Sequence, residues 1–499
     1  MNGMSATVAD SALCRSFGSV IDGAIRSGSE CAALVDPATG AEWGSVDWDA
    51  SFVDDAVETA ERGAGIWGRK TALERADVLD RIGRAIEAHG DELAIYETLA
   101  NGKPLRFTRA EVAASARWWQ YYAALLRTLR EHTIPLSSTK DADVRHEPVG
   151  VAVLITPFNG ALSLGTWKLA PALAAGNSVI IKPPLNSPAS SVVLHRIAAE
   201  AGVPREALQI VQGPAEVGAR LVAHRGVDMV SFTGSTEAAK QVGGIVSGRL
   251  ARFVAEAGGK SAHIVFDDAD IDQAVTAVVQ GVFSGSGQTC VAGSRVLVQR
   301  GVADAFMKRL RDRVSRLVVG DPASDATHLG PIASRAQYDR IVALIDQAEA
   351  DGAERLIGGS APPEVAPGFS DGFWVAPTVL RVADRQTAIC RTEVFGPVMV
   401  VLEFETEEEA VEVANDSDFG LAAGFWTGSI GRVQRVSRQL EAGTVWVNTY
   451  RGMDWQTPFG GVKQSGIGSE NGIEGLREFQ QVKAVVQECG ITPDPFGLV

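Results

Sequence analysis

The segment that ends at Cys290 combines the residue types needed for covalent chemistry. The residues before it, FSGSGQT at 283–289, are mostly small polar residues and glycines, which make poor core material. Such a loop lets the backbone approach a ligand closely and leaves N–H groups free near the sulfur. A free cysteine is more often a small buried hydrophobe, and an unperturbed thiol of pKa about 8.5 is only a few per cent thiolate at pH 7. The composition therefore supports a nucleophile and a structural cysteine equally, and a nucleophile would need positive charge or dipoles nearby.

Two other polar residues follow strongly apolar segments. Glu256 closes ARFVAEA (251–257) just before a Gly-Gly pair, and Asn159 comes shortly after VAVLIT (151–156). Most isolated glutamates are solvated surface residues, and an asparagine in this position is commonly a turn residue. At the carboxyl ends of parallel strands, however, Glu256 is a candidate general base and Asn159 a candidate donor to an oxyanion.

The elements that would position these residues alternate regularly between strand and helix. Apolar, β-branched segments predict strands at 151–156, 178–182, 208–212, 228–233 and 251–257. Helical patterns lie between them at 163–175, 189–201, 215–223 and 236–246. This alternation predicts a parallel sheet covered on both faces, with ligands beyond the carboxyl ends of its strands.

The flanking regions predict further elements. Residues 51–129 have helical periodicity, 131–149 resemble a hairpin, and a second α/β block extends from 270 to about 445. The segment 458–472 looks like a Gly-rich loop. The segment 481–489 alternates like a strand, and such a terminal strand needs a partner in this chain or in another subunit.

The composition excludes several classes of function. The net charge of −15 disfavours binding to nucleic acid and to anionic membranes. No segment approaches the roughly 18 apolar residues of a transmembrane helix, and the N-terminal 20 residues lack the pattern of a secretory signal. The 5 cysteines include no C-x-x-C pair, which favours a reducing, cytoplasmic compartment. The histidines form no H-x-x-x-H pair, so we expect no catalytic metal.

Nucleotide-binding motifs of the common kinds are absent. No G-x-G-x-x-G occurs, and the P-loop glycine that would precede Gly259-Lys260-Ser261 is Val254. The segment FTGST (232–236) ends a predicted strand and begins a predicted helix, whose N-terminus could hold a pyrophosphate. The simpler interpretation is that Ser235 only caps the helix. Lys182, at the end of a neighbouring strand, could reach a ribose or phosphate and favours the nucleotide site.

Taken together and in order, these segments resemble the aldehyde dehydrogenase superfamily from about residue 30 to residue 485. The matching motifs are TPFN (156–159), KPP (182–184), FTGST (232–236), EAGGKS (256–261), GQTCVAGSR (287–295), EVFGPV (393–398), WVNTY (446–450) and PFGGVKQSGIG (458–468). The resemblance implies an α/β fold with two Rossmann-like α/β domains and a small β oligomerisation element. It also implies an NAD(P)-dependent, non-acylating enzyme that acts on a small-molecule aldehyde and assembles as a homodimer or homotetramer.

The domain boundaries follow from the same resemblance. Residues 1–125 and 148–257 are expected to bind the cofactor, and 258–447 to form the catalytic domain that carries Cys290. Residues 126–147 and 478–499 are expected to form the oligomerisation element, and 448–477 to return through the cofactor and substrate region.

The resemblance implies a role for each catalytic residue. Cys290 attacks the aldehyde, and the side chain of Asn159 and the N–H of Cys290 hold the oxyanion. Hydride transfer then leaves a thioester, which water activated by Glu256 hydrolyses, while Glu470 assists proton transfer. The alternatives are a CoA-acylating relative, which generally lacks the Glu256 base, and a catalytically silent protein of the same fold.

The resemblance also implies which residues hold the cofactor. Lys182 is expected on the adenosine side, Glu393 at the nicotinamide ribose, Phe395 near the nicotinamide and Ser235 at the pyrophosphate. Many NAD-preferring members carry a glutamate where this chain has Leu185, so NAD is expected and NADP is admissible. The full set of expected cofactor residues is Ile155, Thr156, Pro157, Phe158, Lys182, Gly213, Phe232, Thr233, Gly234, Ser235, Gly258, Glu393 and Phe395.

Departures from the family pattern bear on the substrate. Gly160 and Ser284 stand where relatives often carry aromatic residues, which predicts a wide tunnel for a bulky hydrophobic or aromatic aldehyde. Arg451 in the same region keeps open a semialdehyde that carries a carboxylate. The expected pocket residues are Gly160, Leu164, Trp167, Ser284, Thr289, Val291, Tyr450, Arg451, Trp455 and Phe459.

Overall fold

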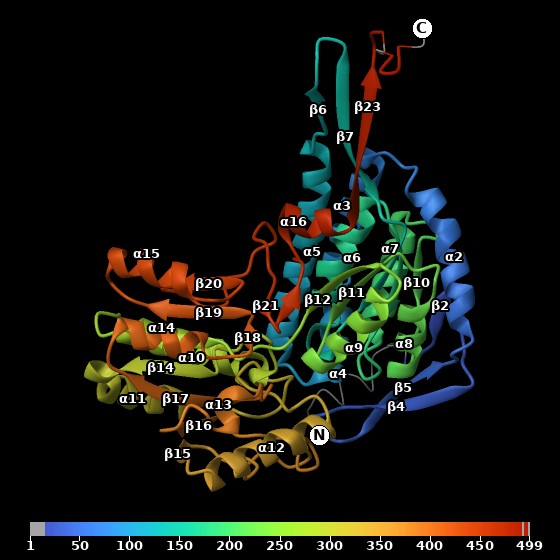
Figure 1. Cartoon of the computed structure of the whole chain (residues 1–499). Helices are drawn as coiled ribbons and strands as arrows, with labels where there is room; N and C mark the ends of the chain where they lie inside the picture. Colours follow the sequence, from blue (N-terminus) through green and yellow to red (C-terminus); the bar gives the residue numbers. More distant parts are fainter. Residues whose placement is uncertain (1–14, 492–493, 498–499) are drawn as a thin grey trace.

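The computed structural model describes residues 15–491 and 494–497, so the expectations for residues 1–14 lie outside the described residues. Two α/β lobes lie side by side, and a narrow β arm extends from one of them (Figure 1). The mixed α/β class that the sequence predicts is confirmed. No helix in the described part of the chain is long and apolar enough to cross a membrane.

An eight-stranded sheet forms the core of the first lobe, in the order β22-β12-β11-β8-β9-β10-β2-β3. Its parallel centre contains β8 (Val151–Ile155), β9 (Ser178–Lys182), β10 (Leu208–Ile210), β11 (Met229–Thr233) and β12 (Arg252–Glu256). These are the predicted strands. Their central residues are buried on both faces, because helices cover both sides of a parallel sheet.

The helices of this lobe also match the periodicity of the sequence. The crossover helices are α6 (Ser163–Ala175), α7 (Ala189–Ala201), α8 (Ala215–Ala223) and α9 (Thr236–Ser247). The N-terminal helical region comprises α2 (Phe52–Trp67), α3 (Ala72–Ala88), α4 (Gly90–Asn101) and α5 (Leu105–Thr128). Before it, β1 (Ser16–Phe17), β4 (Glu30–Val35) and β5 (Glu42–Trp48) form a small sheet, and β2 (Ser19–Ile21) and β3 (Ala24–Arg26) extend the main sheet.

The segment expected to be a Gly-rich loop contains two short strands, β21 (Val462–Lys463) and β22 (Gly466–Ile467). β21 pairs with β18 (Phe419–Gly420). β22 pairs antiparallel with β12, so that Gly466 lies opposite Glu256. The expectation of a plain loop was therefore wrong. Pairing with β22 covers the otherwise open edge of the strand that ends in Glu256.

The second lobe contains a seven-stranded sheet in the order β15-β16-β17-β14-β13-β19-β20, with only β15 antiparallel. The strands are β13 (Ala262–Val265), β14 (Arg295–Gln299), β15 (Glu354–Ile357), β16 (Thr378–Arg381), β17 (Val398–Phe404), β19 (Ala422–Trp426) and β20 (Thr444–Val447). The helices are α10 (Ile271–Phe283), α11 (Arg300–Val314), α12 (Arg335–Ala350), α13 (Ala388–Arg391), α14 (Glu407–Asn415) and α15 (Ile430–Gln439).

The arm is a three-stranded sheet that joins distant parts of the chain (Figure 1). β6 (His132–Pro135) and β7 (Lys140–Pro148) form the predicted hairpin. After α16 (Gly472–Glu478), the C-terminal strand β23 (Gln480–Glu488) pairs antiparallel with β7. The partner that the terminal strand needs is therefore supplied by its own chain.

Arg295 ties the strands of the second lobe to a neighbouring helix. Its buried guanidinium donates to the carbonyls of Lys260 (2.8 Å), Val413 (2.8 Å) and Ala414 (2.7 Å). Two of these carbonyls belong to the last turn of α14, where carbonyl groups have no partners within the helix and a cation is favoured by the helix dipole. One side chain thus satisfies three buried acceptors.

Replacing Arg295 by Met should therefore destabilise the protein, because it leaves these carbonyls unpaired. We expect the melting temperature to fall by roughly 5–10 °C, measured by scanning calorimetry. Arg311→Met, at an exposed position of α11, is the matched control and should change it little. An Arg295→Met protein that melts with the wild type would contradict this account.

Candidate active site

The loop before Cys290 has an unusual backbone. Gly285 (φ 63°), Ser286 (φ 56°) and Gly287 (φ 71°) are consecutive residues in the left-handed region. A Cβ at Gly287 would lie 2.1 Å from the carbonyl oxygen of Gly396, so only glycine fits there. The hydroxyl of Ser286 donates to Gly330 O (2.8 Å), and the side-chain oxygen of Gln288 accepts from Ala333 N (3.0 Å). The loop is thus held in a strained conformation from several sides.

Asn159 reaches this loop from the other lobe. It lies in the 3-10 turn η1 (Phe158–Gly160), just beyond the carboxyl end of β8. Its Nδ2 donates to Gln288 O at 2.9 Å, two residues before the cysteine. A side-chain amide carries two N–H groups, so the second remains available to an oxygen atom held near Cys290.

Glu256 lies at the carboxyl end of β12 and lines the same cavity as Asn159 and Cys290. Only 3% of it is exposed, and neither carboxylate oxygen has a hydrogen-bond partner among the described residues. Burial raises the pKa of Glu256 well above its usual value, the nearby Glu470 raises it further, and Lys168 opposes both. The protonated form of Glu256 is therefore favoured until a ligand or water alters the site.

Glu470 belongs to a buried ion pair with Lys168, which also donates to the hydroxyl of Ser231 (3.0 Å). Lys168 comes from α6, and its side chain is completely buried. The sequence did not single out Lys168, because a lysine within an apolar helix gives no sign of which buried acid it faces.

The thiol of Cys290 is neutral in this environment. Burial raises the pKa of Cys290 to about 12, the neighbouring carboxyl groups of Glu393 and Glu256 raise it, and Arg451 lowers it. The positive charge that a nucleophilic cysteine needs is thus present in Arg451 but does not outweigh burial. Catalysis by this thiol therefore requires either a base that removes its proton or a bound cation that stabilises the thiolate in place of water.

The expected cofactor residues gather at the carboxyl ends of the first lobe's strands. The hydroxyls of Thr156 and Thr233 are buried there without partners, which suits a polar ligand. Burial lowers the pKa of Lys182 to about 8, while Glu216 raises it, and Lys182 Nζ donates to Pro183 O (3.1 Å). The remaining expected residues on this lobe lie at the ends of β8, β10, β11 and β12 or within three residues after them: Ile155, Pro157, Phe158, Gly213, Phe232, Gly234, Ser235 and Gly258.

Ser235 makes the contact that the simpler interpretation predicted. Its hydroxyl accepts from Ala238 N at 3.3 Å and caps α9. A Cβ at Gly234, just before it, would lie 2.6 Å from the ring of Phe232, so a larger residue there would require that ring to shift. The serine hydroxyl therefore serves as a cap, and a pyrophosphate at this helix N-terminus stays a prediction.

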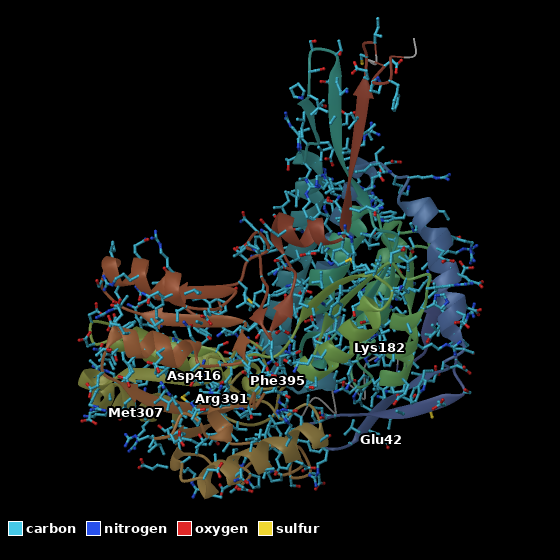
Figure 2. The ribbon with its side chains drawn as sticks, in the orientation of Figure 1. Glu42, Lys182, Met307, Arg391, Phe395 and Asp416 are labelled. Carbon is cyan, nitrogen blue, oxygen red and sulfur yellow. The ribbon has the colours of Figure 1, made fainter. Side chains whose placement is uncertain are left out.

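Residues of the second lobe close this region from the opposite side. Glu393 accepts from Gly259 N (3.1 Å), and burial raises its pKa to about 7. Phe395 meets Phe158 edge-on, with ring centroids 5.7 Å apart. Figure 2 shows Phe395 between the two lobes and Lys182 within the first, so the expected nicotinamide and adenosine ends lie apart.

A cavity of about 520 Å³ contains Cys290, Asn159, Glu256 and Glu470. Nine of the ten expected pocket residues line it: Gly160, Leu164, Trp167, Ser284, Thr289, Val291, Arg451, Trp455 and Phe459. The sequence analysis did not predict that one face of α5, together with the residue Lys103 before it, lines the cavity. Residues at three- and four-residue spacing look like an ordinary core-facing surface. These lining residues are Lys103, Phe107, Ala110, Glu111, Ala114, Ser115, Arg117 and Trp118.

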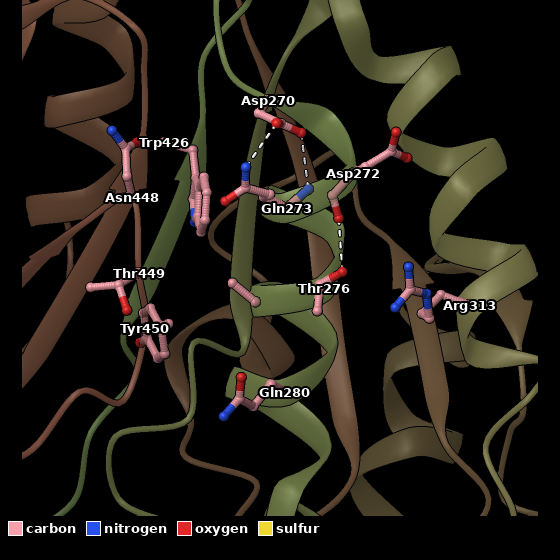
Figure 3. A pocket seen from close by; sticks show the side chains of 11 residues that line it. Asp270, Asp272, Gln273, Thr276, Gln280, Arg313, Trp426, Asn448, Thr449 and Tyr450 are labelled. Carbon is pink, nitrogen blue, oxygen red and sulfur yellow. Dashed lines mark hydrogen bonds between the residues drawn. The ribbon is translucent and has the colours of Figure 1, made fainter.

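Tyr450 is the expected pocket residue that does not line this cavity, so that expectation is corrected. Its ring stacks on His263 with centroids 4.3 Å apart, and its hydroxyl donates to Val291 O (3.0 Å). It lines a second, open hollow beside α10, shown in Figure 3. Tyr450 therefore contacts the backbone of Val291, next to Cys290, from outside the cavity.

Comparison with known proteins identifies the family. The model of the aldehyde dehydrogenase family matches residues 25–485. A putative aldehyde dehydrogenase from Burkholderia cenocepacia is 34% identical, with 96% of this chain and 99% of that chain covered and a TM-score of 0.94. The chain belongs to the aldehyde dehydrogenase family.

Two further solved structures of this aldehyde dehydrogenase family contain a cofactor. Betaine aldehyde dehydrogenase from Staphylococcus aureus in complex with NAD+ is 34% identical to this chain. The match covers 96% of this chain and 96% of that chain, with a TM-score of 0.93. Indole-3-acetaldehyde dehydrogenase in complex with NAD+ is 33% identical, covers 97% of this chain and 98% of that chain, and has a TM-score of 0.94. The likeness extends across both lobes and the arm, so the resemblance seen in the sequence is confirmed.

The raised pKa of Cys290 predicts a distinctive alkylation profile in the free aldehyde dehydrogenase. The thiolate is the reactive form, and below a pKa of about 12 its fraction grows about tenfold for each pH unit. We expect the rate of iodoacetamide modification at Cys290 to rise without a plateau between about pH 7 and pH 9.5. Peptide mass spectrometry separates it from exposed Cys31 and Cys489, with Cys290→Ser as the control. A plateau below about pH 9 would contradict the raised pKa of Cys290.

Proposed function

We propose that this chain oxidises an aldehyde to a carboxylic acid with NAD as hydride acceptor and with Cys290 as nucleophile. The observation that carries the proposal is the hydrogen bond from Asn159 Nδ2 to Gln288 O, which brings the amide of one lobe to the cysteine loop of the other. Glu256 completes the set in the same cavity. Relatives of similar structure have been solved with NAD+.

The chemistry follows from the positions of these groups. The thiolate of Cys290 forms a bond to the carbonyl carbon, and the π electron pair of the carbonyl moves to its oxygen. The free N–H of Asn159 and the backbone N–H of Cys290 stabilise this oxyanion; one such donor is typically worth about 3–4 kcal/mol. NAD, when held by residues such as Lys182, Glu393 and Phe395, would supply the hydride acceptor for that carbon, and the oxidised carbon would remain on Cys290 Sγ as a thioester. Glu256 in its ionised form takes a proton from water, the resulting hydroxide attacks the thioester, and the thiolate leaves.

Glu256 also argues against a CoA-acylating relative. A base is needed to hydrolyse the thioester with water, whereas transfer to a CoA thiol would not need this carboxyl group. The buried pair of Glu470 and Lys168 lies beside it and offers a route by which Glu256 could gain or lose its proton. Product analysis with and without CoA separates the two reactions.

The catalytic residues predict different outcomes for two substitutions. Cys290→Ala should abolish NADH formation, because no thioester can form. Glu256→Gln should still form the thioester but hydrolyse it slowly, which gives a burst of about one NADH per site followed by a slow phase. Stopped-flow absorbance at 340 nm measures both. A Glu256→Gln enzyme with wild-type steady-state turnover would remove this carboxyl group from the mechanism.

The position of Leu185 bears on the choice of cofactor. It lies on the chain after β9, three residues beyond Lys182, where an acidic residue would face the adenosine ribose in many relatives. Without a carboxylate there, the site does not repel a 2′-phosphate. We therefore propose NAD as the cofactor and NADP as an accepted alternative.

Leu185→Glu tests this placement. The added carboxylate should raise KM for NADP roughly tenfold by charge repulsion and leave KM for NAD much less affected. Leu185→Gln has nearly the same shape without the charge and is the control. If both variants change the two cofactors alike, Leu185 does not lie at the ribose.

The arm suggests how copies of the chain assemble. β23 is the outer strand of its sheet, and Val482 and Val486 on it are 64% and 59% exposed. An unpaired edge with exposed valines favours association, so we propose a homodimer or homotetramer formed through this element.

The domain division expected from the sequence places the cofactor on the first lobe and Cys290 on the second. Because the four described cysteines are free, we propose a cytoplasmic location.

The cavity supports a bulky substrate. Gly160 and Ser284 add no bulk to its lining, while Trp167, Trp455 and Phe459 supply apolar walls. We propose an aldehyde of aromatic size as the substrate. The semialdehyde alternative is favoured by one observation, the presence of Arg451 in the lining.

A further inference from the structure

The guanidinium of Arg451 lies in the wall of the substrate cavity, and the nearest carboxylate that acts on it is that of Glu111. Nη1 donates to Ser284 O at 3.3 Å, and the guanidinium makes no ion pair with any described residue. A guanidinium has five N–H donors, so most of its capacity is unused. Burying a charge without a partner costs free energy, and an anion in the cavity would supply the missing interactions.

The nearest candidate within the protein is already engaged. Glu111 on α5 lines the same cavity, but its carboxylate forms an ion pair with Lys103. Arg117, which follows Glu111 by nearly two turns of α5, lines the cavity as well and is exposed to solvent. The other carboxyl groups of the lining are Glu470, which forms an ion pair with Lys168, and Glu256, whose protonated form is favoured by burial. With Lys103 paired to Glu111, the arginines Arg451 and Arg117 therefore leave an excess of positive charge in the lining. This is a local feature, because the chain as a whole has a net charge of −15.

The backbone provides a second observation. Arg451 has φ 61°, a left-handed conformation that a residue with a long side chain adopts at a cost. Such strain persists where the surrounding structure imposes it, and it is concentrated at binding sites. Here it directs a guanidinium to the cavity that holds Cys290.

Part of the cavity wall is aromatic and flat. Trp118 stacks on Trp167 with ring centroids 5.5 Å apart and an angle of 16° between the rings. Trp455 meets Trp118 edge-on at 5.6 Å, and Phe459 meets Trp167 edge-on at 5.4 Å. These rings offer apolar surface to a planar body but no partner for its charge.

We propose that Arg451 binds a carboxylate at the far end of the aldehyde substrate, while the planar body of the substrate packs against the tryptophan pair. The inference rests on the proposed oxidation at Cys290 and names its substrate class: a planar, unsaturated or aromatic aldehyde that also carries a carboxylate. A charge-assisted pair of guanidinium and carboxylate would fix the position of the aldehyde carbon relative to the sulfur.

The test compares matched aldehydes. The probes are 3- and 4-carboxybenzaldehyde, each with the methylbenzaldehyde of the same substitution, assayed with NAD at 340 nm. Wild-type enzyme should prefer at least one carboxylate substrate by about 10- to 100-fold in kcat/KM, mostly through KM. The preference should narrow as KCl rises from about 50 to 500 mM.

Substitutions test whether Arg451 causes the preference for the carboxylate substrate. Arg451→Met should remove most of it, and Arg451→Lys should retain part, because a lysine keeps the charge but not the bidentate geometry. Arg438→Met, at an exposed position of α15 that does not line the cavity, is the control and should retain it fully. Melting temperatures of all variants exclude unfolding as the cause.

The outcomes separate this inference from the proposed function. Equal kcat/KM for carboxylate and methyl substrates in the wild type would overturn the carboxylate site while leaving aldehyde oxidation intact. If Arg451→Met lowered kcat for every aldehyde alike and slowed alkylation of Cys290, Arg451 would serve the thiol and the inference would also be wrong. No NADH from any aldehyde, with Cys290 unreactive, would instead remove the proposed function.

Discussion

The hydrogen bond from Asn159 to the carbonyl of Gln288 joins the two lobes at the point where the reaction would occur. Each end of it depends on its own lobe. Asn159 lies where β8 ends, so the parallel sheet decides its position, and Gln288 follows three left-handed residues that the second lobe holds in place. A small rotation of one lobe against the other would separate the amide from Cys290. The interface between the lobes is therefore part of the candidate active site.

Burial determines which protonation states are favoured in this site. Desolvation is the main cause of the raised pKa values of Cys290 and Glu256, although Cys290 keeps intermediate exposure, and the nearby carboxyl groups raise both further. The resting site thus holds neutral groups that must ionise in turn during the proposed reaction. The buried pair of Glu470 and Lys168 acts on the pKa of Glu256 in opposite directions, since Glu470 raises it and Lys168 lowers it.

The cavity is asymmetric in a way that bears on specificity. Stacked tryptophans form one part of the wall, and arginines form another. Apolar surface favours many planar molecules without distinguishing among them, whereas an unpaired guanidinium penalises a substrate that leaves it unsatisfied. The combination would select by charge among molecules of similar shape.

The sequence by itself determined the family, the parallel sheet of the first lobe and the candidate set of Asn159, Glu256 and Cys290. Its strands and helices were predictable because continuous β-branched segments and helical periodicity are local signals, and its motifs lie in the family order. Only the tertiary structure decided which side chains share a cavity. In the structure Tyr450 stacks on His263 outside the cavity, Lys168 pairs with Glu470, and the face of α5 that carries Trp118 lines the cavity. These contacts join residues hundreds of positions apart, and no local pattern records which face of a helix meets which strand end.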